Sequence, residues 1–253
     1  MSALVHFIQL ALLALSFSVL AAPPQALPAL NIDVKETSVS GVSSGGFMAV
    51  QLQVAHSAII KGAGIIAGGP YYCAQDSVVT ATSDCSCTGE PLLSCDVSAT
   101  SAAVPTLVSA TRSFFAAGLI DDPAHIARQR VVTIAGGKDP LVPAPVTAQL
   151  HAYYHALGLP PEHLRAVALA DAGHTMPTPA YGGACAATEA PYIGKCGFDS
   201  AQAILAWIYD SGPPQPSNTG EPQGRFIEFD QSPYIADNGF FGFRWRSGLD
   251  RTG

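Results

Sequence analysis

The chain has 253 residues, which is enough for one sizeable domain and too few for two ordinary ones. Hydrophobic residues make up 48% and charged residues 12%, so the composition indicates a compact globular protein and excludes extensive disorder. The formal net charge is −7 and no run of Lys or Arg interrupts it, which argues against nucleic acid as a partner.

The first segment, residues 1–22, predicts a signal peptide. An apolar core runs from Leu10 to Leu20, and the small residues Ala21 and Ala22 and two prolines follow. Cleavage is expected near Ala21 or Ala22. The core is about half of the roughly 20 residues that a membrane span needs. Because the charged n-region is weak, an uncleaved anchor or a buried helix remains the alternative. We expect secretion, extracellular or periplasmic, with no stable membrane insertion after cleavage.

Six cysteines agree with export, because an even number in an oxidising compartment predicts up to three disulfides. They are Cys73, Cys85, Cys87, Cys95, Cys185 and Cys196. The last two flank a short loop and are expected to pair with each other. Cys85, Cys87 and Cys95 have a metal site as the alternative. That segment lacks the paired spacing of zinc knuckles and a nearby histidine, so disulfides are favoured.

Strand and helix patterns alternate along the mature chain. The expected strands are residues 30–39, 62–67, 131–135 and 164–169, and the expected helices are residues 44–56, 105–119, 146–157 and 199–209. Residues 70–100 hold four cysteines and little periodicity, so a disulfide-stapled loop is expected there. Alternation of this kind predicts a parallel sheet with helices on both faces, the α/β class.

The strongest motif is Gly41-Val42-Ser43-Ser44-Gly45, a G-x-S-x-G sequence between a predicted strand and a predicted helix. In that setting the serine occupies a sharp, strained turn that projects its Oγ above the sheet, and flanking glycines let the backbone pack closely. The helix that begins there points amide N–H groups at developing negative charge. A Gly/Ser-rich loop is the alternative. The strand–turn–helix context favours Ser43 as a catalytic nucleophile.

A serine nucleophile needs a histidine base and an acid that orients the imidazole. His174 follows the predicted strand 164–169, and Asp139 follows the predicted strand 131–135. The order Ser, Asp, His is that of the α/β-hydrolases. A solvated loop histidine and an Asp-Pro turn former are the alternatives for these two residues. Asp171 is the second candidate for the acid, although it lies only three residues from His174.

Two further histidines, His151 and His155, are four residues apart on one predicted helix, a spacing that can hold a metal ion. The residues between them supply no carboxylate, so a solvated helix face is the favoured interpretation. The proposed chemistry needs no metal and no organic cofactor, and we expect none.

Five segments, taken together and in order, resemble the catalytic domain of extracellular poly(3-hydroxybutyrate) depolymerases. They are GVSSGGFMAVQLQVAHS, GAGIIAGGPYYCAQ, AGGKDPLVP, DAGHTMPTPAYGGAC and FIEFDQS. The similarity covers roughly residues 30–232 and is to the subgroup with an N-terminal lipase box. It implies a circularly permuted α/β-hydrolase with Ser43 as nucleophile, Asp139 as acid, His174 as base and the Ser44 backbone N–H as an oxyanion donor. Only about twenty mature residues precede Ser43, which independently supports the permutation.

The sequence departs from this family after Phe229-Asp230-Gln231. The family continues into further strands and a His-Gly-Cys stretch that supplies the second oxyanion N–H, whereas this sequence has no His-Gly-Cys. Its ending, Phe240–Arg246, resembles nothing in the family. We therefore expect a signal peptide at residues 1–22, the catalytic domain at 23–210, and a linker-like stretch with a truncated C-terminal portion of the same domain at 211–253. A disrupted gene product, a divergent enzyme with another donor and a catalytically weak relative all remain open.

The sequence as a whole predicts a secreted carboxylic ester hydrolase. Its expected substrate is poly(3-hydroxybutyrate) or a related short-chain polyester or oligomer, cleaved through a Ser-His-Asp triad. A feruloyl or acetyl esterase of plant-wall carbohydrate is one alternative. A secreted binding protein that has lost its oxyanion hole is the other. The oligomeric state and the preferred chain length do not follow from the sequence.

Overall fold

The computed structural model describes residues 26–210, 227–230 and 233. Contacts divide the chain into two units, Ile32–Thr219 and the pair of segments Met1–Asn31 and Gly220–Gly253. All described helices and strands belong to the first of these units. The predicted signal peptide, the linker-like residues 211–224 and the aromatic ending at 240–246 lie outside the described residues.

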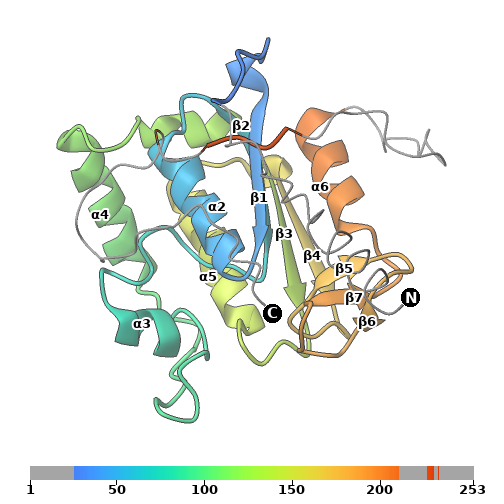
Figure 1. Cartoon of the computed structure of the whole chain (residues 1–253). Coiled ribbons are helices and arrows are strands. Elements are labelled where there is room, and N and C mark those ends of the chain that lie inside the picture. The colour runs from blue at the N-terminus through green and yellow to red at the C-terminus, as the bar shows by residue number, and fades with distance from the viewer. Residues whose placement is uncertain (1–25, 211–226, 231–232, 234–253) are drawn as a thin grey trace, which may run out of the picture. The chain divides into compact units, whose positions relative to one another are not determined.

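Four parallel strands form the central sheet in the order β1-β2-β3-β4, as the alternating pattern predicted (Figure 1). The strands are β1 (Thr37–Val42), β2 (Ile60–Ile66), β3 (Arg130–Gly136) and β4 (Leu164–Leu169). Val42, Ile66, Ile134 and Val167 are paired across the sheet in one row, so the carboxyl ends of the four strands lie at one edge. β1 begins later than expected, because Val34–Glu36 form a 3₁₀ turn that Asp33 caps.

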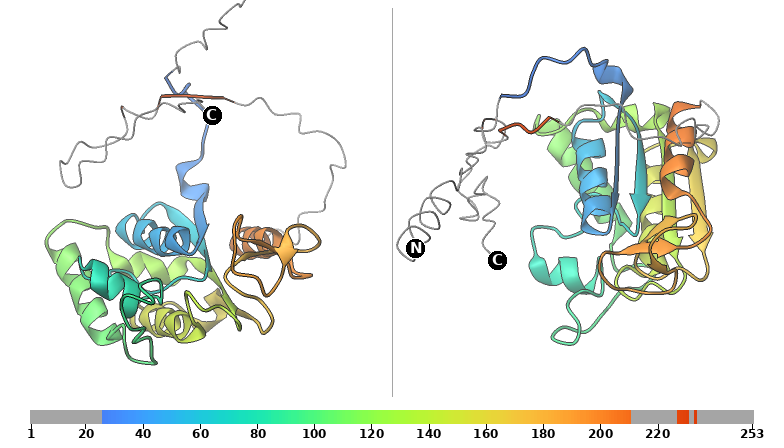
Figure 2. Two further views of the ribbon diagram at one scale, coloured as in Figure 1. Left: turned by 60° about the horizontal axis from the view of Figure 1, so that its bottom comes forward. Right: turned by 45° about the vertical axis from the view of Figure 1, so that its right-hand side comes forward.

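Helices cover both faces of this sheet (Figures 1 and 2). They are α2 (Ser44–Ala55), α4 (Val104–Ala116) and α5 (Ala144–Ala156) on one face and α6 (Ser200–Tyr209) on the other. The alternation of side chains along each strand explains both layers. Ile65 and Val131 belong to the core cluster with α2 and α5, whereas their neighbours Ile66 and Val132 pack with α6.

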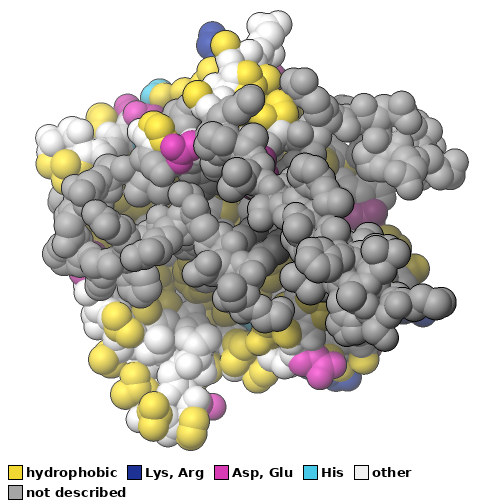
Figure 3. Space-filling model, in the orientation of Figure 1, with side chains coloured by type: hydrophobic (Ala, Val, Ile, Leu, Met, Phe, Trp, Pro, Cys, Tyr) yellow, Lys and Arg dark blue, Asp and Glu magenta, His cyan; other side chains and the backbone are white. Residues whose placement is uncertain are grey.

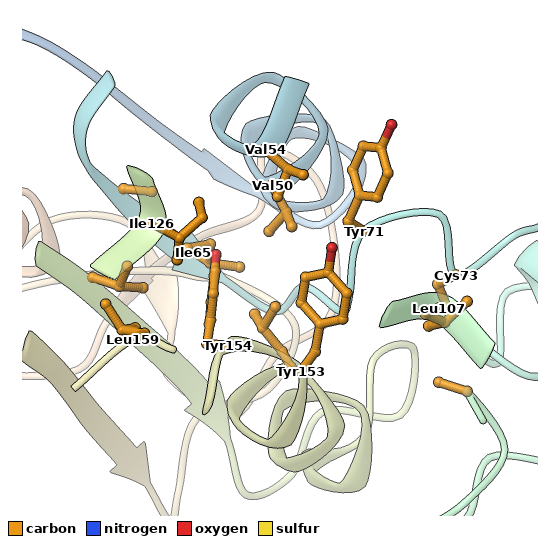
Figure 4. Close-up of a cluster of buried hydrophobic side chains, with 14 of the residues drawn as sticks. Val50, Val54, Ile65, Tyr71, Cys73, Leu107, Ile126, Tyr153, Tyr154 and Leu159 are labelled. Atoms are coloured by element: carbon orange, nitrogen blue, oxygen red, sulfur yellow. The ribbon is translucent and has the colours of Figure 1, made fainter. Parts of the chain in front are cut away.

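The larger core cluster lies between α2 and α5 (Figure 4). Tyr153 and Tyr154 of α5 are fully buried there and point toward Val50 of α2. The Tyr153 hydroxyl is 2.6 Å from Thr111 Oγ1, and the Tyr154 hydroxyl donates to Gln53 Oε1 at 2.5 Å. Burial raises the pKa of both phenols well above the usual value, so both remain neutral hydrogen-bonding groups.

One short α-helix and three short strands were not predicted from the sequence pattern. A short helix, α3 (Val78–Ser83), lies within the segment expected to be a stapled loop, and Ser77 caps it by accepting from the Thr80 N–H. After β4 the chain forms a second sheet of three strands, β5 (Met176–Thr178), β6 (Gly183–Ala184) and β7 (Ile193–Lys195), in the order β5-β7-β6. Strands of two or three residues and a helix of six leave no periodicity that a sequence pattern can reveal.

All six cysteines form disulfides: Cys73–Cys85, Cys87–Cys95 and Cys185–Cys196. The expected pairing of the last two is confirmed. The alternative of a metal at Cys85, Cys87 and Cys95 is wrong, because a sulfur in a disulfide has no thiolate to offer a metal. The first two disulfides close a lobe around α3, residues 70–97, which we call the α3 lobe. None of the described helices is long and apolar enough to cross a membrane.

Candidate active site

Ser43 occupies the turn between β1 and α2 in a strained conformation, with φ 57° and ψ −124°. A side chain other than glycine in this region costs about 1–3 kcal/mol and persists where the surroundings fix it. Here the Ser43 N–H donates to the Ile66 carbonyl of β2 at 2.9 Å, and the Phe47 N–H donates to the Ser43 carbonyl at 2.9 Å. The turn is therefore held to the sheet on one side and to the helix on the other.

Glycines permit this turn because the backbones approach closely. A Cβ on Gly41 would lie 2.2 Å from the carbonyl carbon and oxygen of Gly45, and one on Gly46 would lie 2.8 Å from the Ile66 oxygen. A Cβ on Gly45 would meet nothing within 4 Å. The expectation that both glycines of the motif are needed for close packing is thus right for Gly41 and wrong for Gly45. The second close approach belongs to the next residue, Gly46.

The first turn of α2 begins directly after Ser43. Ser44 is the first helical residue, and among the described residues its backbone N–H has no hydrogen-bond acceptor. Free N–H groups at a helix N-terminus attract negative charge, and the helix dipole adds to the effect. The Ser43 hydroxyl likewise makes no hydrogen bond to any described residue, His174 included. The Ser43 hydroxyl and a free N–H group at a helix N-terminus therefore lie side by side.

His174 and Asp139 form a buried hydrogen-bonded pair. His174 Nδ1 lies 2.8 Å from Asp139 Oδ2, and both side chains are almost completely buried. The other carboxylate oxygen, Oδ1, accepts the N–H groups of Leu141 at 2.8 Å and Val142 at 2.9 Å. Both oxygens of the carboxylate thus have hydrogen-bond partners, which fixes its orientation. A carboxylate beside Nδ1 keeps the proton on that nitrogen and leaves Nε2 as the acceptor.

The loops that carry Asp139 and His174 are joined through their backbones at the carboxyl edge of the sheet. Lys138 N–H donates to the Ala172 carbonyl at 2.9 Å. Asp171, the second candidate for the acid, is exposed and makes an ion pair with Lys138 at 2.7 Å, which lowers its pKa. The structure thus brings His174 together with Asp139 and directs Asp171 toward Lys138.

The loop closed by the third disulfide surrounds His174 with further contacts. The His174 N–H donates to Thr188 Oγ1 at 3.0 Å, and the Tyr192 ring lies edge-on to the imidazole with centroids 6.0 Å apart. The Gly173 N–H donates to the Cys185 carbonyl at 2.9 Å. Sequence analysis missed Thr188 and Tyr192. The only available signal was their place between two cysteines that follow the histidine.

A cavity of about 480 Å³ opens beside Ser43 and Ser44, within the usual size range of small-molecule sites. It lies against α2 and the α3 lobe. Its lining residues are Ser43, Ser44, Phe47, Met48, Gln51, Tyr72, Cys73, Ala74, Gln75, Asp76, Ala81, Thr82, Cys85, Ser86, Thr88 and Val142. The surface of the cavity is mainly apolar, with a smaller polar share, which suits a largely apolar ligand.

Comparison with known proteins places this site in context. No family model matches the chain. A poly(3-hydroxybutyrate) depolymerase of Delftia acidovorans is 41% identical over 222 residues, which cover 87% of this chain and 42% of the relative. A polyhydroxybutyrate depolymerase of Talaromyces funiculosus is 34% identical over 218 residues, which cover 85% of this chain and 59% of the relative.

Solved structures of PHB depolymerases are similar to this chain in fold as well as in sequence. The crystal structure of PHB depolymerase from Penicillium funiculosum matches with a TM-score of 0.70 and 34% identity over 84% of this chain and 63% of that one. A serine-to-alanine variant of PHB depolymerase complexed with an R3HB trimer matches with a TM-score of 0.69 and 32% identity over 82% of this chain and 61% of that one.

The chain is a homologue of the poly(3-hydroxybutyrate) depolymerases. It has their α/β-hydrolase fold, and it spans about half the length of the curated relatives that it matches. In the described part of this chain Ser43 follows the first strand, and Asp139 and His174 follow the third and fourth. That order agrees with the permuted arrangement that the sequence resemblance implied.

Outside the cavity, the α3 lobe has an apolar outer surface (Figure 3). Val78, Val79, Leu92 and Leu93 are exposed there, and Leu92 is 92% exposed. Exposed apolar side chains that gather in one place usually mark a contact surface. The same lobe carries this apolar surface and forms part of the wall of the cavity beside Ser43.

The two histidines of α5 make contacts with other residues and not with each other. His151 Nε2 lies 2.6 Å from Thr133 Oγ1 of β3, and His155 Nδ1 lies 3.3 Å from the Leu159 carbonyl. Burial, and then the neighbouring His155, lower the pKa of His151. The expected solvated face is therefore right for His155 and wrong for His151, which packs against the sheet. Among the described residues no group of His, Cys, Asp and Glu is arranged to hold a metal.

Proposed function

We propose that this chain is a secreted serine esterase that hydrolyses the ester bonds of poly(3-hydroxybutyrate) or of related short-chain polyesters and oligomers. The observation that carries the proposal is the buried His174–Asp139 hydrogen bond of 2.8 Å, at the same edge of the sheet as the strained Ser43 turn. The relatives named as depolymerases support the substrate class, and one structural neighbour holds an R3HB trimer.

In the proposed mechanism Ser43 Oγ attacks the ester carbonyl while His174 Nε2 takes the hydroxyl proton. Asp139 stabilises the imidazolium and holds the ring in place. The Ser44 N–H, at the start of α2, donates to the oxyanion of the tetrahedral intermediate. His174 then returns its proton to the departing alcohol oxygen, and an acyl-enzyme remains on Ser43. Water, activated by His174 in the same way, releases the hydroxy acid.

One oxyanion donor, the Ser44 N–H, is proposed from the described residues. A second donor is not assigned in this part of the chain. Removing one donor from a complete oxyanion hole lowers turnover by about 10²–10³-fold. An active site with one donor is therefore expected to turn over about 10²–10³-fold more slowly than the same site with two.

The proposed setting is an oxidising compartment, with residues 23–210 as the catalytic domain and 1–22 as a cleaved leader. Three disulfides in a domain of this size support export, because such bonds persist mainly outside the cytosol. The apolar surface of the α3 lobe suits a hydrophobic polyester, which it can contact next to the cavity.

The experiment that tests the proposal is the release of 3-hydroxybutyrate from amorphous polymer and from the linear trimer by the mature chain. Methyl ferulate is the comparison substrate, because a plant-wall esterase would prefer it. Polymer or trimer hydrolysis that Ser43→Ala abolishes supports the proposal. Preferential ferulate hydrolysis would move the chain to the carbohydrate esterases. Binding of the trimer without any hydrolysis would favour a secreted binding protein.

A further inference from the structure

Part of the cavity wall comes from the α3 lobe and carries a tyrosine and an aspartate that are hydrogen-bonded to each other. Tyr72 and Asp76 both line the cavity, and the Tyr72 hydroxyl donates to Asp76 Oδ2 at 2.8 Å. The Tyr72 ring packs edge-on to Phe114 with centroids 5.0 Å apart, and its N–H donates to Gln51 Oε1 of α2 at 3.3 Å. The phenol is thus held at a defined place in the wall.

The backbone that presents this pair is strained. Tyr72, Gln75 and Asp76 have φ values of 57°, 48° and 59°, in the left-handed region that residues other than glycine, asparagine and aspartate avoid, so the strain falls on Tyr72 and Gln75. Each such residue costs on the order of 1 kcal/mol, and outliers of this kind gather at functional sites. All three residues line the cavity that contains Ser43. The strain therefore lies at the cavity wall, where it aims the side chains.

In the described part of the chain, the wall of the cavity carries negative charge and no positive charge. Among the described residues that line it, Asp76 is the only charged one, and no Lys, Arg or His is present. The phenol proton of Tyr72 is engaged by Asp76, which also raises the pKa of Tyr72 so that the phenol stays protonated. The pair consequently offers oxygen lone pairs and one negative charge. It can accept a hydrogen bond from a hydroxyl group and repels a carboxylate.

The two ends of the proposed substrate should interact differently with the negative charge of Asp76. An oligomer of 3-hydroxy acids has a free hydroxyl at one end and a carboxylate at the other. When Ser43 attacks an ester, the acyl part bonded to Ser43 Oγ carries the hydroxyl end, and the part that leaves as an alcohol carries the carboxylate end. The acyl part is thus the one whose terminus matches the cavity.

Resting on the function proposed above, we propose that the cavity is the acyl-side subsite and that the Tyr72–Asp76 pair selects its occupant. The pair admits acyl chains that end in a hydroxyl or in a neutral group and disfavours acyl chains that end in a carboxylate. Asp76 is thereby a specificity-determining residue, and Tyr72 positions it. The carboxylate-bearing part of the oligomer leaves on the other side of Ser43, away from Asp76.

Two p-nitrophenyl esters of equal chain length test this assignment. The hexanoate carries a neutral acyl chain, and the mono-adipate carries the same number of carbons with a terminal carboxylate. The quantity measured is the ratio of kcat/KM for the neutral ester to that for the charged ester. Two unit charges about 8 Å apart at an effective dielectric constant of about 30 change an equilibrium by roughly tenfold. Asp76→Asn is therefore expected to lower the ratio by roughly tenfold, mainly through faster turnover of the adipate.

The matched control is Asp96→Asn, which removes the same charge from the α3 lobe at an exposed residue that does not line the cavity. We expect it to change the ratio less than twofold. Tyr72→Phe keeps the charge of Asp76 but releases its carboxylate, and we expect a ratio between those of the wild type and Asp76→Asn. Because Asp76 is exposed, the wild-type ratio is also expected to fall with added salt.

Two results overturn the assignment and differ from a failure of the proposed function. An unchanged ratio in Asp76→Asn, or an equal shift in Asp96→Asn, would leave Ser43-dependent hydrolysis intact and remove the selective role of the pair. If instead the wild type hydrolyses neither ester faster than Ser43→Ala, the esterase proposal itself fails and the subsite falls with it.

Discussion

Replacing Asp139 with Asn removes the negative charge beside His174 while keeping the shape of the side chain. The amide oxygen can still accept the N–H groups of Leu141 and Val142, which Oδ1 accepts in the native protein at 2.8 and 2.9 Å. The amide nitrogen, however, then faces His174 Nδ1 as a donor. The imidazole must therefore carry its proton on Nε2, where it cannot take the proton of Ser43.

The size of this effect follows from the geometry. Unit charges about 4 Å apart at an effective dielectric constant of about 20 attract each other by about 4 kcal/mol, which is a factor of about 10³ in rate. The wrong tautomer adds to this loss, so kcat for p-nitrophenyl butyrate should fall by about 10³–10⁴-fold in Asp139→Asn. The temperature of thermal unfolding should change little, because the backbone hydrogen bonds of the loop are kept.

The control for this variant is Asp171→Asn, the same substitution in the same pair of loops. Asp171 is exposed and contacts Lys138 rather than His174. Its replacement should leave kcat within about twofold, since exposed ion pairs contribute little. A fully active Asp139→Asn, or an Asp171→Asn that is as inactive as Asp139→Asn is expected to be, would refute the assignment of the acid.

Two further predictions concern the turn and the core. Gly46→Ala places a Cβ 2.8 Å from the Ile66 oxygen and should lower the free energy of unfolding, measured by chemical denaturation, by about 1–3 kcal/mol. Gly45→Ala is the control, because its Cβ meets nothing within 4 Å, and it should be nearly neutral. Equal destabilisation by the two substitutions would contradict the packing described. The depressed pKa of His151 means that the unfolded state takes up a proton more readily than the folded state, so stability should fall as the pH drops below about 6.5. In His151→Gln the unfolding free energy should depend less steeply on pH in that window, and an unchanged pH profile would rule out this contribution.

The sequence predicted the main sheet because its strands are long enough to show a pattern. The predicted strand 164–169 has the bounds of β4, and Asp199 caps α6 as expected, with Oδ1 accepting from the Gln202 N–H at 2.9 Å. The elements that were missed, α3 and the three-stranded sheet, are held by disulfides and loop hydrogen bonds. These elements form because of tertiary contacts, so the local periodicity of the sequence does not predict them.

The candidate site was predictable to the extent that parallel strands align their carboxyl ends. That rule alone suggested that Asp139 and His174 meet, and the structure joins them at 2.8 Å. It could not exclude Asp171, because the deciding contact is with Lys138. Nor could it reveal the Tyr72–Asp76 pair, since hydrogen bonds of side chains on an irregular loop leave no sequence pattern.

The most direct test of the central claim is covalent labelling of the mature chain with diethyl p-nitrophenyl phosphate, followed by mass spectrometry of the peptides. A serine activated by His174 should take up one equivalent of the diethyl phosphate group on the peptide that contains Ser43. Ser43→Ala should take up none, and Asp139→Asn should react far more slowly. A folded protein that remains unlabelled, or that is labelled equally in Ser43→Ala, would contradict the account.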